Sequence, residues 1–226
     1  MCLNQKMLSR LYPILPRLYP ILDASVLAGE GVAREQQLQR LGQELLESGV
    51  TLLQYRNKSG GEAEVLADAR ILRDGMPAGK CLLILNDYPR LAVEAQFDGV
   101  HLGQGDMPAS QGRAILGNDR VLGLSTHNLE QLAAAERSSA NYVAIGPVFA
   151  TSSKQNPDPV VGLEGVKRAR MLTTKPLVAI GGITLETCRQ VVDAGADSIA
   201  VISSLFSDQG GRAPAKVAED FFAKLR

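Results

Sequence analysis

The sequence predicts an α/β protein that folds as a single (β/α)8 barrel, and three observations support this prediction. The chain has 226 residues, a length that fits one domain with a full core. Short apolar runs rich in Val, Ile and Leu alternate with longer helical patterns, which indicates parallel βα units. Because the runs are apolar throughout, both faces of each strand must be covered, and a closed TIM barrel explains this together with the intervening helices.

Eight strands are predicted, each brief and mostly apolar. They cover residues 18–22 (LYPIL), 50–55 (VTLLQY), 81–85 (CLLIL), 98–102 (DGVHL), 120–123 (RVLG), 141–145 (NYVAI), 176–180 (PLVAI) and 197–201 (DSIAV). Short runs of this composition are typical of strands that are wetted on neither face.

A helical pattern follows each predicted strand. These patterns span residues 33–48, 62–76, 89–96, 108–116, 128–138, 163–172, 184–194 and 213–225. Asn128 and Thr184 are suitable N-caps for two of them. An open doubly wound sheet is the alternative architecture, but the G-x-G-x-x-G fingerprint that would support it does not follow the first strand.

The N-terminal region contains a short duplication. The segment RLYPIL occurs at residues 10–15 and again at 17–22, and only one copy can form the first core strand. We prefer the second copy because Asp23 follows it. We therefore expect residues 1–17 to be an extension and residues 18–226 to form the catalytic barrel domain. Prolines and arginines interrupt the apolar N-terminal stretch, so we predict neither a membrane span nor an export signal.

Composition limits the classes of partner. Lys plus Arg and Asp plus Glu both total 24, so the formal net charge is zero. A balanced chain provides no broad basic field for nucleic acid or an anionic membrane, and any anion must be bound locally. The three cysteines form neither a C-x-x-C pair nor a disulfide framework. We therefore predict a cytoplasmic protein that acts on small molecules.

The loops that follow the strands carry the candidate chemistry, because barrel enzymes place their sites at the carboxyl ends of the strands. After the second strand, period-two alternation sends Gln54, Arg56 and Lys58 to one side of the chain. Two cations on one side would form an anion clamp. The alternative is a solvated loop with basic tips.

Acidic residues follow the third and fourth strands. Asp87 comes after Asn86 in the third loop, and Asp106 lies in the fourth loop within HLGQGD. Two carboxylates at adjacent strand ends can converge on Mg²⁺, which typically takes one or two carboxylates together with water and phosphate oxygens. Each aspartate could alternatively be an N-cap or a turn residue.

The later loops suit phosphate. The long sixth loop contains Thr151, Ser153 and Lys154, whose hydroxyls and ammonium group could contact phosphate oxygens. Gly181 and Gly182 end the seventh strand, and such glycines permit close backbone approach to a phosphate. A flexible surface loop and a simple tight turn are the respective alternatives.

The positions of the two histidines in the sequence indicate different roles. His101 lies within an apolar strand, and we expect it to be structural. His127 follows GLST at the end of the fifth strand, where it could be an acid/base group or could serve in a cap or on the surface. With no third His or Cys beside them, zinc has little support.

Taken together, the strand-end motifs resemble those of thiamine phosphate synthase. The motifs are QYRNK, LND, VHLGQGD, GLSTH, GPVFATSSK, AIGGI and VISS, in that order from about residue 18 to the C-terminus. The resemblance implies a (β/α)8 barrel that joins 4-amino-5-hydroxymethyl-2-methylpyrimidine diphosphate to 4-methyl-5-(2-hydroxyethyl)thiazole phosphate, forming thiamine phosphate and pyrophosphate.

The resemblance also implies roles for individual residues. Asp87 and Asp106 would hold Mg²⁺, and the pyrimidine would contact Gln54 and Ser125. The remaining implied contacts are Arg56, Lys58, Asn86 and Lys154 with the diphosphate, and Thr151, Ser153, Gly182, Ile202 and Ser203 with the thiazole phosphate. No protein nucleophile is implied, and the oligomeric state stays open, with a homo-oligomer among the alternatives.

Two departures from the family pattern are visible. The sixth loop reads ATSSK where Pro-Thr-x-Thr-Lys is common, so Ser153 keeps a hydroxyl and loses a methyl group. The first strand ends in LYPILD where Val-Thr-Asp is more typical. Two rival functions share the pocket: a thiazole tautomerase-like relative that would use His127, and a phosphate-ligand sensor without turnover. Asp87, Asp106 and Lys154 favour the synthase over both.

Overall fold

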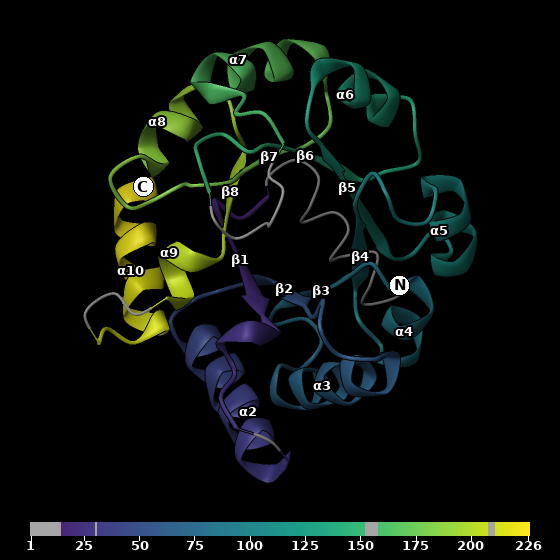
Figure 1. Ribbon diagram of the computed structural model, residues 1–226, viewed down its shortest axis with the longest axis vertical. Coiled ribbons are helices and arrows are strands. Elements are labelled where there is room, and N and C mark those ends of the chain that lie inside the picture. The colour runs from purple at the N-terminus through teal and green to yellow at the C-terminus, as the bar shows by residue number, and fades with distance from the viewer. Residues whose placement is uncertain (1–14, 30, 152–157, 208–210) are drawn as a thin grey trace.

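The computed structural model describes residues 15–29, 31–151, 158–207 and 211–226, and within them eight parallel strands close into a barrel in chain order. Figure 1 shows these strands at the centre with the helices arranged around them. The strands are β1 (Leu18–Asp23), β2 (Leu52–Arg56), β3 (Leu82–Asn86), β4 (Gly99–Leu102), β5 (Val121–Thr126), β6 (Tyr142–Ile145), β7 (Leu177–Ile180) and β8 (Ser198–Val201). The predicted (β/α)8 barrel is confirmed.

The helices lie on the outside of the barrel (Figure 1), where all of the main ones except the last connect successive strands. They are α2 (Gly31–Glu47), α3 (Glu62–Gly75), α4 (Pro89–Glu94), α5 (Ala109–Leu116), α6 (Leu129–Glu136), α7 (Gly162–Leu172), α8 (Cys188–Asp193) and α10 (Pro214–Leu225). Two short elements were not predicted, the 3-10 helix η1 (Ala24–Val26) after β1 and α9 (Ser203–Phe206) after β8.

Period-two alternation along the strands sorts their side chains into two cores. One set packs between the sheet and the helices, and a second, smaller set fills the inside of the barrel. On β2, for example, Leu53 and Tyr55 belong to the outer core and Leu52 to the inner one. The next inward positions along the same strand are therefore Gln54 and Arg56. Polar residues thus reach the barrel mouth because of the same alternation that fills its floor.

The predicted boundaries agree with the structure to within a few residues, with two exceptions. Helix α8 begins at Cys188, so Thr184 is not its N-cap; the chain first makes a turn in which the Thr184 N–H donates to Thr187 Oγ1 at 2.9 Å. Strand β5 runs to Thr126, beyond the predicted end at residue 123. Asn128 caps α6 as predicted, accepting the Gln131 N–H at 2.9 Å.

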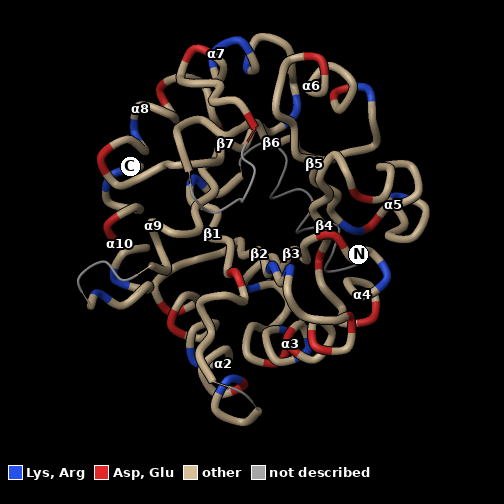
Figure 2. The backbone as a smooth tube through the Cα atoms, viewed as in Figure 1, with Lys and Arg blue, Asp and Glu red and all other residues tan. Residues whose placement is uncertain are grey.

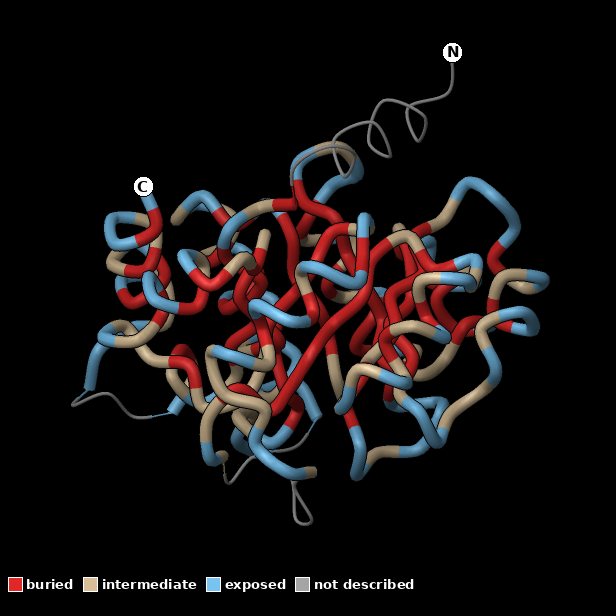
Figure 3. Tube along the Cα trace, turned by 90° about the horizontal axis from the view of Figure 1, so that it is seen from above, coloured by how far each residue is buried: buried red, intermediate tan, exposed pale blue. Residues whose placement is uncertain are grey.

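The second RLYPIL copy supplies β1, which confirms that choice, whereas the first copy lies almost entirely outside the described residues. The proposed division into residues 1–17 and 18–226 stays a prediction. Basic and acidic segments are interspersed around the outer helices (Figure 2), and the most deeply buried segments run through the middle of the molecule (Figure 3). Within the described part of the chain, no helix has the length and apolar character that crossing a membrane requires.

Candidate active site at the carboxyl end of the barrel

A cavity of about 440 Å³ opens at the carboxyl ends of the strands. Eleven of the residues predicted to form the site line it: Gln54, Arg56, Lys58, Asn86, Asp87, Asp106, Ser125, Thr151, Gly182, Ile202 and Ser203. The other two, Ser153 and Lys154, lie outside the described residues. Residues that are far apart in the sequence therefore meet here because parallel strands bring all their carboxyl ends to one rim.

The basic residues that follow β2 are held by carboxylates on neighbouring strands. Register pairs Arg56 with Asp23 across β1 and β2, and their side chains form an ion pair. Lys58 forms an ion pair with Asp87, which follows β3. The two cations therefore lie together at the rim, each facing a carboxylate, and their role as an anion clamp stays a prediction.

Asn57, between these two cations, shapes the loop from inside. Its side chain is buried, and its Oδ1 accepts the N–H of Ser59 at 3.1 Å and of Gly60 at 2.8 Å. Its Nδ2 donates to Glu64 Oε1 at 2.9 Å, which joins the loop to α3. Asn57 thus satisfies backbone donors that the turn would otherwise leave without a partner.

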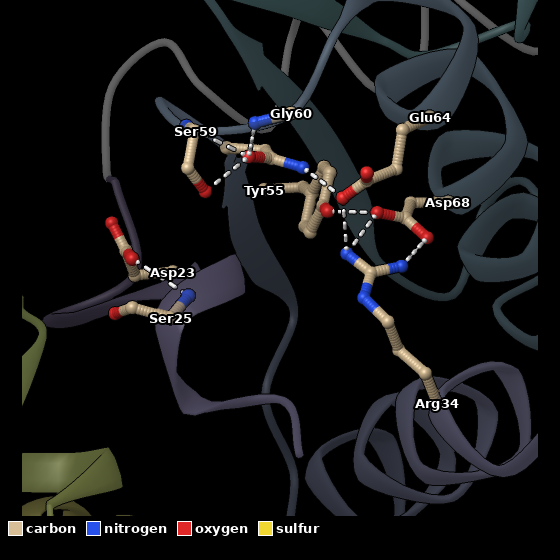
Figure 4. A network of polar contacts seen from close by, with 9 residues as sticks. Asp23, Ser25, Arg34, Tyr55, Ser59, Gly60, Glu64 and Asp68 are labelled. Carbon is tan, nitrogen blue, oxygen red and sulfur yellow. Dashed lines mark hydrogen bonds and ion pairs between the residues drawn. The ribbon is translucent and has the colours of Figure 1, made fainter. Parts of the chain in front are cut away.

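A charged network behind β2 extends this support (Figure 4). Arg34 reaches from α2 to Asp68 on α3, with Nη1–Oδ1 at 2.6 Å and Nη2–Oδ2 at 2.8 Å, and its Nη2 also donates to Glu64 Oε1 at 2.9 Å. The Tyr55 hydroxyl on β2 donates to the same Asp68 carboxylate, which is 1% exposed. Three elements are therefore tied together beneath the cationic loop. Sequence inspection did not find this network, because nothing local links residues 34, 55 and 68.

The two predicted metal-binding carboxylates lie side by side. Asp87 has a φ of 68°, a left-handed conformation that Asp tolerates better than most residues, and its N–H donates to the His101 carbonyl at 2.9 Å. Burial, together with the neighbouring Asp106 carboxylate, raises the pKa of Asp87 to about 6. Hydrogen bonds from the Asp87 carboxyl group and from the Gly103 N–H outweigh burial at Asp106 and lower its pKa. Negative charge is therefore concentrated where a cation could be held.

A series of hydrogen-bonded polar side chains runs from the cavity floor, at Gln54, His101 and Ser125, into the interior of the barrel. Gln54 Nε2 donates to the Tyr19 hydroxyl at 3.0 Å, and that hydroxyl lies 2.8 Å from the Tyr142 hydroxyl. His101 Nδ1 lies 2.8 Å from Tyr142 Oη, and its Nε2 lies 2.8 Å from Ser125 Oγ. Burial lowers the pKa of His101 to about 4, so the ring is neutral near pH 7.

The expectation that His101 is structural is consistent with its burial, but the ring also contacts the predicted pyrimidine residue Ser125 directly. Tyr19 and Tyr142 were not predicted to belong to the site. Both sit at inward positions of short apolar strands, and their types alone suggested ordinary core residues. Both lie at the amino-terminal ends of their strands, Tyr19 as the second residue of β1 and Tyr142 as the first residue of β6, so their position along the strands gave no signal of a site at the carboxyl rim.

The opposite wall of the cavity is built from backbone. Gly181 and Gly182 have φ values of 102° and 64°, conformations that favour glycine. A Cβ on Gly182 would lie 2.4 Å from the Ala150 carbonyl oxygen. Ile202 and Ser203, where β8 passes into α9, line the same wall. The wall therefore exposes main chain that side chains would otherwise cover.

His127 stands at the edge of the cavity. Its Nδ1 lies 2.8 Å from the Gly146 carbonyl oxygen and 3.5 Å from Asp158 Oδ2. The hydrogen bond to a carbonyl requires a proton on Nδ1, so the ring is oriented by the loop after β6.

Comparison with known proteins agrees with this geometry. A profile of the thiamine monophosphate synthase family matches residues 18–205. A thiamine-phosphate synthase of Koribacter versatilis is 51% identical over 199 residues, covering 88% of this chain and 93% of that protein. The chain belongs to the thiamine monophosphate synthase family.

Other relatives support the same assignment. A thiamine-phosphate synthase of Halalkalibacterium halodurans is 37% identical and covers 79% of this chain and 85% of its own. A solved thiamine phosphate pyrophosphorylase from Pyrococcus furiosus superimposes with a TM-score of 0.78 at 31% identity, over 92% of this chain and 95% of that structure. The resemblance to thiamine phosphate synthases inferred from the strand-end motifs is confirmed, and this family is one of transferases.

The barrel fold itself is shared more widely than the thiamine monophosphate synthase family. A 3-hexulose-6-phosphate synthase superimposes with a TM-score of 0.65 at 16% identity, a similarity that concerns the fold alone. The synthase assignment therefore rests on the sequence relatives and the residues at the barrel mouth.

Proposed function

We propose that this chain joins 4-amino-5-hydroxymethyl-2-methylpyrimidine diphosphate to 4-methyl-5-(2-hydroxyethyl)thiazole phosphate, releasing pyrophosphate and forming thiamine phosphate. The observation that carries the proposal is the arrangement of charge around one cavity: Arg56, Lys58, Asp87 and Asp106 gather on one side, and the main chain of Gly181 and Gly182 forms the other. One side suits a diphosphate with its metal ion, and the other suits a second phosphate.

The donor set fits Mg²⁺. Asp87 and Asp106 offer hard carboxylate oxygens, and the raised pKa of Asp87 reflects burial beside a second carboxylate that a divalent cation would neutralise. Among the described residues no cluster of three or more His, Cys, Asp or Glu side chains forms a metal site, so the remaining ligands would be water and the diphosphate itself. When bound, Mg²⁺ would neutralise charge on the leaving pyrophosphate.

Arg56, Lys58 and Asn86 would bind the diphosphate, and Lys154 would join them from the sixth loop. Arg56 and Lys58 now pair with Asp23 and Asp87, so a bound diphosphate would exchange those partners for its own oxygens. Charge-assisted contacts of this kind stabilise an anion more strongly than neutral hydrogen bonds do.

The two organic rings would occupy the space between these walls. Gln54 and Ser125, at the cavity floor, would hydrogen-bond to the pyrimidine. The thiazole phosphate would contact Thr151, Gly182, Ile202 and Ser203, with Ser153 contributing a hydroxyl from the sixth loop.

The chemistry needs charge neutralisation more than acid/base catalysis. Departure of pyrophosphate from the pyrimidine methylene leaves a carbocation-like centre, which the thiazole nitrogen then captures. Positive charge placed where the leaving group accumulates negative charge lowers that barrier by preorganised electrostatics. Arg56, Lys58 and Lys154 would supply this charge, and no protein nucleophile is required. We also propose that the enzyme acts in the cytoplasm, independently of nucleic acid and membranes.

The test is pyrophosphate release by the purified protein with both substrates, with and without Mg²⁺, and with the product detected as thiochrome after oxidation. Mg²⁺-dependent release that requires the thiazole phosphate and yields thiamine phosphate is the expected result. Binding of the thiazole phosphate without turnover would overturn the proposal in favour of a tautomerase or a sensor.

A further inference from the structure

Two tyrosines in the interior of the barrel connect the polar residues of the cavity floor. Tyr19 and Tyr142 are each 1% exposed, and they meet edge to face with ring centroids 6.0 Å apart. The Tyr142 ring stacks on His101, at 5.5 Å between centroids and an interplanar angle of 26°. Buried hydroxyl groups need hydrogen-bond partners. The Tyr19 hydroxyl finds them in Gln54 and Tyr142, and the Tyr142 hydroxyl finds them in Tyr19 and His101.

The backbone makes room for this arrangement at Gly123. A Cβ at this inward position of β5 would lie 2.1 Å from Tyr142 Cζ and 2.3 Å from its hydroxyl. The Tyr142 side chain thus occupies the space that a β5 side chain would fill, and its hydroxyl reaches both Tyr19 and His101. Packing alone would be satisfied by two ordinary aliphatic residues, so the tyrosine and the glycine together indicate a polar requirement at this point.

The Gln54 amide, which donates to the Tyr19 hydroxyl, implies one direction of hydrogen-bond donation along these side chains. Tyr19 accepts from Gln54, so its own hydrogen goes to Tyr142. Tyr142 then donates to His101 Nδ1, which places the proton of the neutral ring on Nε2. His101 Nε2 therefore donates to Ser125 Oγ.

The direction of hydrogen-bond donation determines whether Ser125 and Gln54 present a donor or an acceptor to a ligand. Ser125, whose oxygen accepts from His101, directs its hydroxyl hydrogen into the cavity as a donor. Gln54, whose amide nitrogen donates to Tyr19, presents its amide oxygen as an acceptor. A 4-aminopyrimidine offers a ring nitrogen that accepts and an amino group that donates, which is the complementary pattern. A 4-oxo analogue offers the reverse, an oxygen that accepts and a ring N–H that donates.

We propose that Tyr19, Tyr142 and His101 form a relay that sets the donor and acceptor roles of Ser125 and Gln54, and so selects the amino form of the pyrimidine over the oxo form. The three act through Ser125 and Gln54 and are positioning residues. The inference rests on the proposed function of the site, and it adds specificity-determining residues to that function.

The test compares Tyr142→Phe with the parent enzyme. The ratio of kcat/KM for the amino and the 4-oxo pyrimidine diphosphates is measured, with KM for each substrate of the reaction. Without the Tyr142 hydroxyl, His101 and Ser125 can adopt either direction. We expect the KM for the pyrimidine diphosphate to rise about tenfold, and the amino-to-oxo preference to fall by a similar factor, the equivalent of one net hydrogen bond. The KM for the thiazole phosphate should stay within about twofold, because its predicted contacts lie on the opposite wall.

Tyr19→Phe provides a second variant, which removes a link near Gln54 and leaves the His101–Ser125 contact in place. It should weaken the same preference. The variants Tyr142→Phe and Ser125→Ala should combine non-additively, because the relay acts through Ser125. Thermal unfolding of each variant shows whether it folds.

The outcomes separate this inference from the proposed function. If the parent turns over and both phenylalanine variants keep its amino-to-oxo preference, the relay is refuted while the synthase assignment stands. If the parent binds the pyrimidine diphosphate by calorimetry without turnover, the function is refuted, and the same amino-to-oxo comparison is made by affinity. A parent that neither binds nor converts the pyrimidine overturns both.

Discussion

Replacing Arg34 with Met should strongly destabilise the protein, although Arg34 lies outside the cavity. Arg34 makes two hydrogen bonds to Asp68 and one to Glu64, and its removal leaves the Asp68 carboxylate with the hydrogen bond from the Tyr55 hydroxyl. Asp68 is 1% exposed, so water cannot replace the guanidinium. The variant would therefore hold a buried charge that is no longer compensated.

The expected loss of unfolding free energy follows from the burial of the Asp68 carboxylate. Breaking a buried ion pair by removing one partner costs about 3 to 5 kcal/mol of unfolding free energy. The Glu64 side chain is 49% exposed, so its lost contact adds little to this figure. Arg40 on the same helix is the matched control, because its side chain is 68% exposed and pairs with Glu44 at 3.9 Å. Arg40→Met should change the unfolding free energy by less than about 0.5 kcal/mol.

Urea unfolding followed by circular dichroism measures both variants. The double variant Arg34→Met/Asp68→Asn should recover at least half of the loss, because it removes the buried charge while an amide oxygen can still accept from Tyr55. An Arg34→Met protein within about 1 kcal/mol of the parent would refute the argument. A double variant less stable than Arg34→Met would show that charge burial is not the cause.

Three further predictions concern the cavity. Burial beside Asp106 raises the pKa of Asp87 to about 6, above the unfolded value of about 3.9, so the EDTA-treated protein should gain thermal stability as pH falls from 7 to 5. Asp87→Asn should lose this gain, along with Mg²⁺-dependent pyrophosphate release. Gly182→Ala should raise the KM for the thiazole phosphate at least tenfold, because φ is 64° and the added Cβ meets the Ala150 carbonyl. His127→Ala should keep synthase turnover within about threefold in the thiochrome assay, since the proposed chemistry needs no general base.

The fold was accessible from the sequence because its signal is local and repeated. Each strand is a short apolar run, and all the main helices except α8 begin and end close to their predicted ranges, so the alternation alone indicated a closed parallel barrel. The predicted boundaries are wrong where polar residues continue a strand or resemble a helix cap. Strand β5 continues through Ser125 and Thr126, whose polarity suggested a loop; Ser125 lines the cavity, and the buried Thr126 hydroxyl donates to the Ala144 carbonyl on β6. Thr184 resembles a cap but heads a separate turn before α8.

Most of the candidate site was also predictable, since barrel topology brings every strand end to one rim. Position after a strand was sufficient to place Asp87 beside Asp106 without any knowledge of distances. What could not be predicted was the set of groups that orient them. The contact between Arg34 and Asp68 depends on how α2 packs against α3, and that packing is set by whole helix faces rather than by a motif.

The proposed relay beneath the cavity shows why residues that orient a site are hard to identify from the sequence. Tyr19 and Tyr142 come from strands that are not neighbours in the barrel, and their hydroxyls meet across its interior. A contact of this kind depends on barrel closure and on the inward register of both strands at once. It also depends on Gly123, because any side chain there would displace the Tyr142 ring. Residues that touch a ligand recur at strand ends and can be found one at a time, whereas residues that orient them become visible only when the barrel is assembled.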